Sequence, residues 1–382
     1  MMRGLRRALA RILPTIMLTL VLVQPSRAAS AATVACDGVF HQMASPAFGV
    51  RSQLYSPSAL SPTDVWVSGT FTRADTDPSD RGFTMHFDGA SWSKVRIDTP
   101  RKVEPYGLQA VSPTQAWIVG GAQLANGGSA GYAIERWNGS FWTRVSLPVN
   151  LSFVALAVRG TGSDLWVVGR NYADGTGNAN PIALHWDGSH WTVVPMALPP
   201  VAAEITVVFN DVAVISPTDA WAVGGSVGLS HVVVEHWDGS SWSLVSAPDP
   251  GDAAQLLGVT AVTASNVWAT GQQDSIPLIE HWNGSVWTKV TAPSTSGNGN
   301  LFGVAAVSAN DLWAVGSQWA SPPPNPDTLA ARSAGGAWTT VAAPDPVAGR
   351  SGLVDIAALP TGQVFAAGSI SSSPQTFIVE AC

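Results

Sequence analysis

The sequence predicts an all-β protein built from one repeated unit of four antiparallel strands. A V-W-x-x-G strand recurs along the chain, and a second W-x-x-V strand recurs in step with it. Composition supports this reading, because 37 glycines, 27 prolines and 17 tryptophans accompany only 12% charged residues. Beyond the first two dozen residues no segment has the 3.6-residue apolar period of a helix.

Two independent series of aromatic residues define the repeat. The first aromatic ladder, in the V-W-x-x-G strands, is Trp66, Trp117, Trp166, Trp221, Trp268, Trp313 and Phe365. The second, in the closing strands, is Trp92, Trp142, Trp191, Trp242, Trp287 and Trp338. A period near 50 residues with four strands per unit is typical of a propeller blade of the kelch type. Because one such sheet cannot bury both faces alone, blades must stack.

The sequence therefore predicts a seven-bladed β-propeller of four-stranded antiparallel blades in a single domain over residues 32–382. Turn chemistry agrees, since Ser216-Pro217-Thr218-Asp219 suits a type I turn and Asp238-Gly239 supplies the positive φ of a hairpin turn. The expected repeats span about 52–100, 106–149, 151–200, 207–250, 255–295, 300–346 and 352–382.

The two ends of the chain predict how the ring closes. The last unit stops at Phe377–Cys382, which matches Val234–Trp237 and lacks a closing strand. This match places Glu380 at the position of Glu235 and Cys382 at that of Trp237. Residues 36–46 resemble the missing hairpin, so the N-terminal strand is expected to complete the last blade.

The only two cysteines are Cys36 and Cys382, and in this alignment both fall at the junction between the last strand and the borrowed one. A disulfide there would lock the ring, and an exported protein permits it. The alternative is that Cys36 is a lipid-modified N-terminus, although Thr33-Val34-Ala35 matches a lipidation signal poorly.

Residues 1–31 read as a secretory signal peptide. Arg3, Arg6, Arg7 and Arg11 precede an apolar stretch from Ile12 to Val23, and Ala29-Ser30-Ala31 supplies small residues for cleavage. An uncleaved membrane anchor is the alternative. Removing five arginines takes the formal charge from −7 to −12, that is 14 basic against 26 acidic residues. The electrostatic field of so acidic a protein does not attract nucleic acid or an anionic membrane. We expect a secreted or cell-surface monomer with no membrane span once the signal is removed.

The hairpins carry a family resemblance. The Trp-Asn/Asp-Gly-x-x-Trp hairpins and V-W-A-V-G strands resemble repeats of secreted bacterial β-propellers related in shape to kelch and galactose-oxidase propellers. His236-Trp237-Asp238-Gly239-Ser240-Ser241-Trp242 is also similar to the Asp box of sialidase-type propellers, with no residue between Asp and Gly and His in place of Ser. Both likenesses imply a fold and no particular reaction.

Most residues that look catalytic belong to the repeat. His86, His185, His236 and His281 share one register position, and Glu135, Glu235, Glu280 and Glu380 are expected to share another. A single active site needs residues that break the symmetry, so these are expected to hold blades together. The aromatic ladders are likewise expected to fill the core rather than serve as sugar platforms. No metal-ligand spacing, nucleophile elbow or phosphate loop is present, and we expect no metal and no cofactor.

Function is expected in the segments that vary between units. These are the loops between the second and third strands, such as 73–81, 170–181 and 317–328, and the blade-to-blade connections, which share one face. The candidate ligand-binding residues are Arg51, Arg73, Arg101, Tyr172, Trp319 and Arg350. Trp319 and Tyr172 offer exposed aromatics, and the arginines form a possible cationic arc for a carboxylate or sulfate ligand.

The expected function is non-catalytic recognition or scaffolding, with a glycan or extracellular protein as the partner on the loop-bearing face. The alternatives are a glycoside hydrolase or polysaccharide lyase of a propeller family, and a purely structural surface protein. An enzyme should place at least two convergent ionisable groups that break the symmetry in the central opening.

Overall fold

The computed structural model groups residues 33–382 into one compact unit. It describes residues 36–74, 77–97, 102–123, 129–147, 152–171, 180–197, 206–227, 231–248, 251, 253–295, 297–319, 326–347 and 350–382. Within them every regular element is a β-strand, so the chain is all-β, as the composition indicates.

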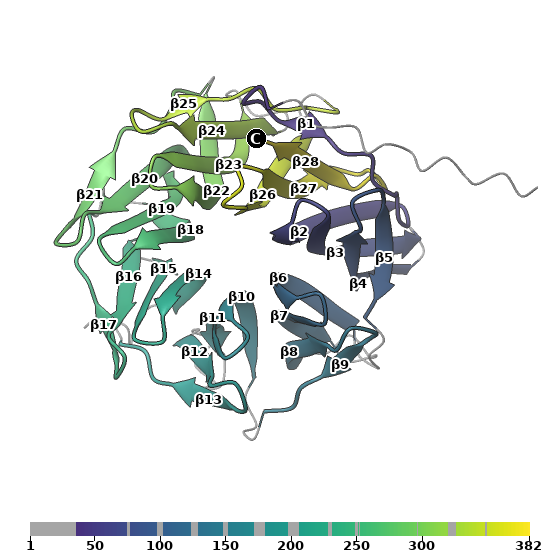
Figure 1. Ribbon diagram of the computed structural model, residues 1–382, viewed down its shortest axis with the longest axis horizontal. Coiled ribbons are helices and arrows are strands. Elements are labelled where there is room, and N and C mark those ends of the chain that lie inside the picture. Colours follow the sequence, from purple (N-terminus) through teal and green to yellow (C-terminus); the bar gives the residue numbers. More distant parts are fainter. Residues whose placement is uncertain are drawn as a thin grey trace, which may run out of the picture. The chain divides into compact units, whose positions relative to one another are not determined.

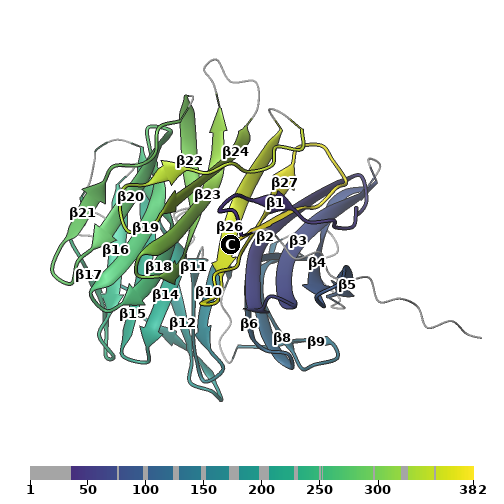
Figure 2. The same ribbon diagram turned by 45° about the horizontal axis from the view of Figure 1, so that its top comes forward.

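Five sheets contain four antiparallel strands each, in sequence order from the inside outward (Figures 1 and 2). The strands are β6 (Lys102–Ser112), β7 (Gln115–Gln123), β8 (Ser129–Trp137) and β9 (Trp142–Arg144); β10 (Phe153–Thr161), β11 (Asp164–Asn171), β12 (Asn180–Trp186) and β13 (Trp191–Val194); β14 (Thr206–Ser216), β15 (Asp219–Val227), β16 (Val232–Trp237) and β17 (Trp242–Leu244); β18 (Ala254–Thr263), β19 (Asn266–Gln273), β20 (Ile276–Trp282) and β21 (Trp287–Val290); and β22 (Asn298–Ser308), β23 (Asp311–Trp319), β24 (Asp327–Ser333) and β25 (Thr339–Thr340).

The remaining strands belong to one eight-stranded sheet made of two four-stranded sets. One set is β2 (Arg51–Ser61), β3 (Asp64–Ala74), β4 (Asp77–Phe87) and β5 (Trp92–Arg96), and the other is β26 (Ser351–Ala358), β27 (Val364–Ile370), β28 (Phe377–Ala381) and β1 (His41–Gln42). Among the described residues one β-ladder pair, Gln53↔Ser369, links a strand of one set to a strand of the other. The sets and sheets stand side by side around a common centre, so residues 33–382 have the arrangement of propeller blades (Figure 1).

The N-terminal strand β1 pairs antiparallel with β28, through His41↔Glu380 and Gln42↔Val379. The pairing of β28 with β27 shows that the predicted register of the last unit is wrong by one residue. Glu380 lies opposite Phe365, as His236 lies opposite Trp221, so it occupies the histidine position and not that of Glu235. Cys382 therefore follows the position of Trp237. Because the ending F-I-V-E-A-C contains a Glu but no Trp, the sequence alignment matched this Glu to Glu235.

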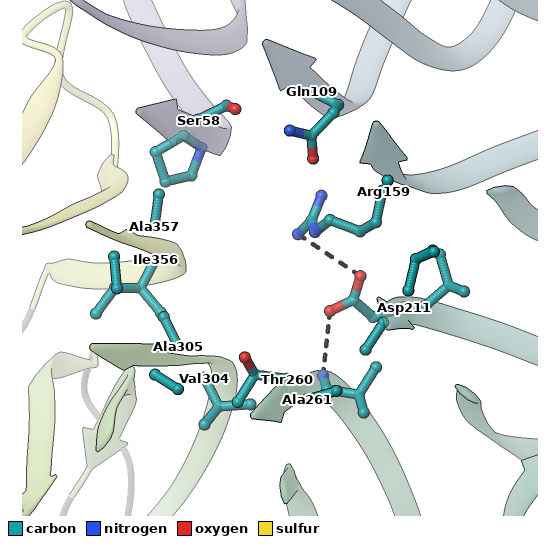
Figure 3. Close-up of a pocket in the computed structure, with 18 of the residues that line it drawn as sticks. Ser58, Gln109, Arg159, Asp211, Thr260, Ala261, Val304, Ala305, Ile356 and Ala357 are labelled. Atoms are coloured by element: carbon teal, nitrogen blue, oxygen red, sulfur yellow. Dashed lines mark hydrogen bonds and ion pairs between the residues drawn. The ribbon is translucent and has the colours of Figure 1, made fainter. Parts of the chain in front are cut away.

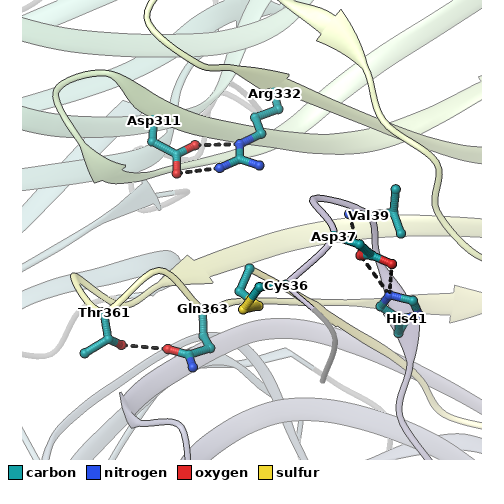
Figure 4. Close-up of a disulfide and its surroundings, with 9 residues drawn as sticks. Cys36, Asp37, Val39, His41, Asp311, Arg332, Thr361 and Gln363 are labelled. Atoms are coloured by element: carbon teal, nitrogen blue, oxygen red, sulfur yellow. Dashed lines mark hydrogen bonds and ion pairs between the residues drawn. A yellow bond between two sulfur atoms is a disulfide. The ribbon is translucent and has the colours of Figure 1, made fainter. Parts of the chain in front are cut away.

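The predicted disulfide is confirmed. Cys36 and Cys382 are bonded with their Cα atoms 4.8 Å apart, although 346 residues separate them (Figure 4). Asp37 accepts a hydrogen bond from the Val39 backbone N–H at 3.2 Å, as Asp238 accepts one from Ser240. In other sheets the peptide chain runs directly from the third strand into the Asx-Gly hairpin. Here the disulfide makes that connection.

Each innermost strand carries a bulge near its beginning, opposite the repeated glycine of the V-W-x-x-G strand. In β14, for example, Asn210 is the extra residue between Phe209↔Gly224 and Asp211↔Val223. The bulge brings the Val208 carbonyl so close to Gly224 that a Cβ there would overlap it. The repeated glycine is therefore required by a close backbone approach.

The first aromatic ladder lies between neighbouring sheets. Trp66 contacts two tryptophans of the next sheet, Trp137 at 5.2 Å and Trp142 at 6.0 Å between ring centroids. All its members except Trp268 are at most 2% exposed. Trp268 differs from the others, since it packs against a core cluster but is only partly buried. The next sheet has Ser333 at the third-strand position where four other sheets have tryptophan.

Candidate functional site

Two of the predicted ligand-binding residues flank one end of the sheets. We call this end, where the innermost strands begin, the loop side, and the opposite end the turn side. Arg51 begins β2 and is exposed, and it lines a depression of about 470 Å³ with Phe71 and Ser371. Exposed Arg350 accepts a backbone hydrogen bond from Ser371 at 2.7 Å, which puts it beside the same depression.

The other candidates are scattered or lie elsewhere. Arg73 is exposed near the end of β3, and the loop expected at 73–81 is mostly strand, because β3 reaches Ala74 and β4 begins at Asp77. Trp319 is not on a loop, since it is the half-buried last residue of β23 and pairs with Asn298. Arg101 and Tyr172 lie outside the described residues.

The repeated histidines have structural partners. His236 stacks on Trp221 with ring centroids 4.4 Å apart, and its Nε2 lies 2.9 Å from the Asp219 carboxylate. The same Trp–His–Asp arrangement recurs in other sheets, and Arg332 replaces the histidine over Trp313, bonded to Asp311. An arrangement that recurs in several sheets cannot define one active site.

The symmetry is broken in the centre, along the innermost strands (Figure 3). Seven equivalent residues, each opposite a member of the first ladder, line a central cavity of about 320 Å³. They are Ser58, Gln109, Arg159, Ala213, Thr260, Ala305 and Ala357. Arg159 is the one charged residue among these seven, so it makes the lining of the cavity asymmetric.

Arg159 binds two carboxylates from strands on different sides of the centre. Its Nη2 donates to Asp355 Oδ2 at 3.1 Å and lies 3.6 Å from Asp211 Oδ1. Asp355 Oδ2 also accepts from Ser56 Oγ at 3.0 Å, and Asp211 Oδ2 accepts from the Val259 N–H at 3.1 Å. The three side chains, 23%, 17% and 10% exposed for Arg159, Asp355 and Asp211, form one ion cluster.

Burial sets the charges of this cluster. It raises the pKa of Asp211 to about 6, an effect that the positive Arg159 opposes and the negative Asp355 reinforces. Burial lowers the pKa of Arg159, but the two carboxylates outweigh it and the pKa lies above its usual value. The guanidinium therefore stays charged, and Asp211 can take up a proton in mildly acidic solution.

The ion cluster separates two cavities. Residues near the strand ends line the cavity on the turn side, and bulge residues line one of about 200 Å³ on the loop side. The loop-side cavity includes Tyr55 and Tyr106, whose rings meet edge to face at 5.3 Å, together with Phe302 and Asn210. Tyr106 donates to Glu104 at 2.5 Å. Burial, followed by this bond, raises the pKa of Tyr106, so its hydroxyl is a donor at any physiological pH.

Sequence reasoning missed Arg159, Asp211 and Asp355. A signal existed, because Asp211 and Asp355 stand where other innermost strands have Gly, Ala or Pro. The functional departures from the repeat were expected in the loops, whereas Arg159, Asp211 and Asp355 lie within regular strands. Their convergence depends on the closure of the sheets around one centre, which no local pattern contains.

The described residues contain no group of three or more His, Cys, Asp or Glu placed to hold a metal ion. A search of the same residues found no helix long and apolar enough to cross a membrane.

Comparisons with known proteins give a fold and no family. No protein-family model matches the chain, and no curated protein matches it. Among solved structures, YCF48 from Cyanidioschyzon merolae is 13% identical over 90% of this chain and 98% of its own, with a TM-score of 0.56. U3-55K is 8% identical over 90% and 98%, with a TM-score of 0.57.

A GH74 enzyme of Niastella koreensis is 11% identical over 84% of this chain and 52% of its own, with a TM-score of 0.51. At such identities a structural likeness shows shared architecture alone. By its strands and by these neighbours, the chain is a β-propeller repeat protein.

Proposed function

We propose that residues 36–382 form a seven-bladed propeller whose last blade is completed by the N-terminal strand. The innermost strands support this count, because β2, β6, β10, β14, β18, β22 and β26 each contact the next, and β26 contacts β2. The kelch-like and Asp-box-like character of the hairpins stays a prediction from sequence.

We further propose that the protein is exported. The basic and apolar start of the chain supports a signal peptide, and the disulfide between Cys36 and Cys382 is stable in an oxidising compartment.

Within this architecture we propose a recognition module that binds an extracellular protein or glycan on its loop side without catalysing a reaction. The observation that carries this proposal is the loop-side cavity above the ion cluster. Tyr55, Tyr106, Phe302 and Asn210 supply aromatic surface and one amide, which is the composition of a binding pocket. Beneath them Arg159 pairs with both carboxylates, so each is already engaged in an ion pair. A propeller neighbour, YCF48, has been solved bound to a D1 peptide, which supports a peptide as one partner class.

A glycoside hydrolase or polysaccharide lyase is the second candidate, and one observation favours it. Two carboxylates that break the symmetry share the centre, and the pKa of Asp211 is raised to about 6, in the range useful to a general acid. An ion pair to Arg159 would have to open before either acted.

The test displays the full chain on a glycan array and against a random peptide library. Alanine variants of Tyr106 and Phe302 serve as cavity changes, and Arg51→Ala and Trp319→Ala probe the loop side. Saturable binding that the cavity variants weaken at least tenfold supports recognition. Folded protein that binds neither library, or cleavage of a polysaccharide that is abolished in Asp211→Asn, contradicts it.

A further inference from the structure

A further cavity, of about 520 Å³, lies on the turn side between the sheet β18–β21 and the sheet β22–β25. Ser265 and Asn310 of two strand-connecting turns lie at its mouth, and Trp268 and His281 line it. It is therefore remote from the loop-side cavity, at the opposite end of the innermost strands, and the proposed function does not use it.

The cavity results from one missing side chain. In four other sheets a tryptophan on the third strand covers the first-ladder tryptophan of the preceding sheet, as Trp282 covers Trp221 at 4.9 Å. Ser333 occupies this position in β24, because it pairs with Leu312 as Trp282 pairs with Val267. Trp338 still meets Trp268, edge to face at 5.9 Å. One side of the Trp268 indole is thus left uncovered.

The remaining contacts of Trp268 hold the indole as a fixed platform. One face stacks on His281 with ring centroids 4.1 Å apart. Its Nε1–H donates to Asn266 Oδ1 at 2.7 Å, and the same oxygen lies 2.9 Å from His281 Nε2. The polar edge of the indole is therefore satisfied, and what faces the cavity is apolar ring surface.

The rim of the cavity is polar and uncharged. Asn266 stands where the equivalent strands of other sheets have Asp164, Asp219 or Asp311, so the carboxylate of those sites is replaced by an amide. Asn283, Asn310 and Ser333 add further amide and hydroxyl groups, and no lysine, arginine, aspartate or glutamate lines the cavity. Burial lowers the pKa of His281, which keeps the imidazole neutral at physiological pH.

We propose that this cavity is a binding site for a neutral sugar ring, with the pyranose C–H face packed on Trp268 and its hydroxyls bonded to the surrounding amides. A ring with apolar faces and a hydroxylated edge matches a flat indole framed by Asn side chains, each of which both donates and accepts. A nucleotide would also stack, but its phosphate would find no cation here. A cationic ligand would find no carboxylate.

The decisive variant is Ser333→Trp, which introduces the residue that four other sheets have at this position. Trp137, Trp186, Trp237 and Trp282 each donate their indole N–H to a turn carbonyl, and the equivalent carbonyl here belongs to Ala309, which lines the cavity. The new side chain would cover Trp268 and fill the site without removing any of its polar groups. We expect this variant to lose binding and to keep or raise its thermal stability.

The measurement is calorimetric titration of the full chain with the methyl glycosides of glucose, galactose, mannose and N-acetylglucosamine, preceded by a neutral-glycan array. Trp268→Ala and Asn310→Ala are second variants, expected to weaken binding at least tenfold. Thr218→Ala is the matched control for Asn310, because it changes the same turn position in another sheet, and it should leave affinity unchanged.

Two results would overturn the proposal: no binding of any neutral glycan by folded protein, or binding that survives both Ser333→Trp and Trp268→Ala. Arg51→Ala and Tyr106→Ala keep this site intact, so a loss confined to those variants concerns the loop side alone. Failure at one end of the propeller therefore leaves the other proposal standing.

Discussion

Arg159 and Asp355 are joined by a hydrogen bond of 3.1 Å across the centre, although 196 residues separate them in the chain. With Asp211 they form the ion cluster that divides the central opening into two cavities. Because all three groups are largely withdrawn from water, the cation and the carboxylates depend on one another.

The first prediction concerns this dependence. Arg159→Met leaves two buried carboxylates without a counterion, and we expect it to lower the free energy of unfolding at pH 7 by about 3 kcal/mol. The triple variant Arg159→Met/Asp211→Asn/Asp355→Asn should recover most of that loss, because no buried charge remains. Denaturant unfolding measures both, and a single variant as stable as the parent would show that the cluster is solvated.

A second prediction follows from the disulfide. Cys36→Ser/Cys382→Ser removes a link that closes almost the whole folded chain, and the unfolded state gains entropy. We expect a loss on the order of 5 kcal/mol in stability, or an equivalent fall in melting temperature on reduction of the parent protein. Reductant should leave the double variant unaffected. Equal melting temperatures for the parent and the double variant would show that the disulfide does not contribute this stability.

The third prediction concerns a buried glutamate on the third strand of its sheet. Burial raises the pKa of Glu135 from 4.5 to about 7, and the charge of Arg144 offsets this only in part. The carboxyl is thus favoured in its protonated form when the protein is folded. The contribution of Glu135 to stability is therefore greatest below pH 4.5 and is lost as the pH rises through about 7.

Glu135→Gln should remove this decline, so that the variant is more stable than the parent at pH 8 by about 3 kcal/mol, as a rise from 4.5 to about 7 implies. Glu235→Gln should act in the same direction, because burial also raises the pKa of Glu235 to about 7. Urea unfolding at pH 4.5 and pH 8 checks both. A parent that gains stability with pH relative to the variants would refute the assignment.

The fourth prediction tests the glycine of the V-W-x-x-G strand. A methyl group at Gly224 would overlap the Val208 carbonyl, so Gly224→Ala should cost roughly 1–3 kcal/mol through a shifted bulge. Gly336→Ala is the matched control, because no atom lies within 4 Å of the added carbon, and it should be near neutral. Similar melting temperatures for the two variants would show that the bulge yields without strain.

Much of the architecture was predictable because it depends on short local sequence patterns that recur in each repeat. The aromatic ladders and Asx-Gly turns mark the strands of each sheet, and every repetition reinforces the same reading. The pairing of Cys36 with Cys382 follows from an unfinished last unit and its missing piece at the other end. The weakest inference was the register of that last unit, where Glu380 lies one residue from its predicted place, because no tryptophan anchors the alignment.

The sequence by itself determined the strands, the repeat and the covalent closure of residues 36–382, since each depends on neighbours along the chain or on repetition. Only the tertiary structure decided which departures from the repeat meet. Arg159, Asp211 and Asp355 converge because innermost strands from three sheets face one centre. Ser333 opens a cavity only because β24 lies against the uncovered side of Trp268. Both sites join residues distant in sequence, and packing between sheets, rather than strand propensity, brings them together.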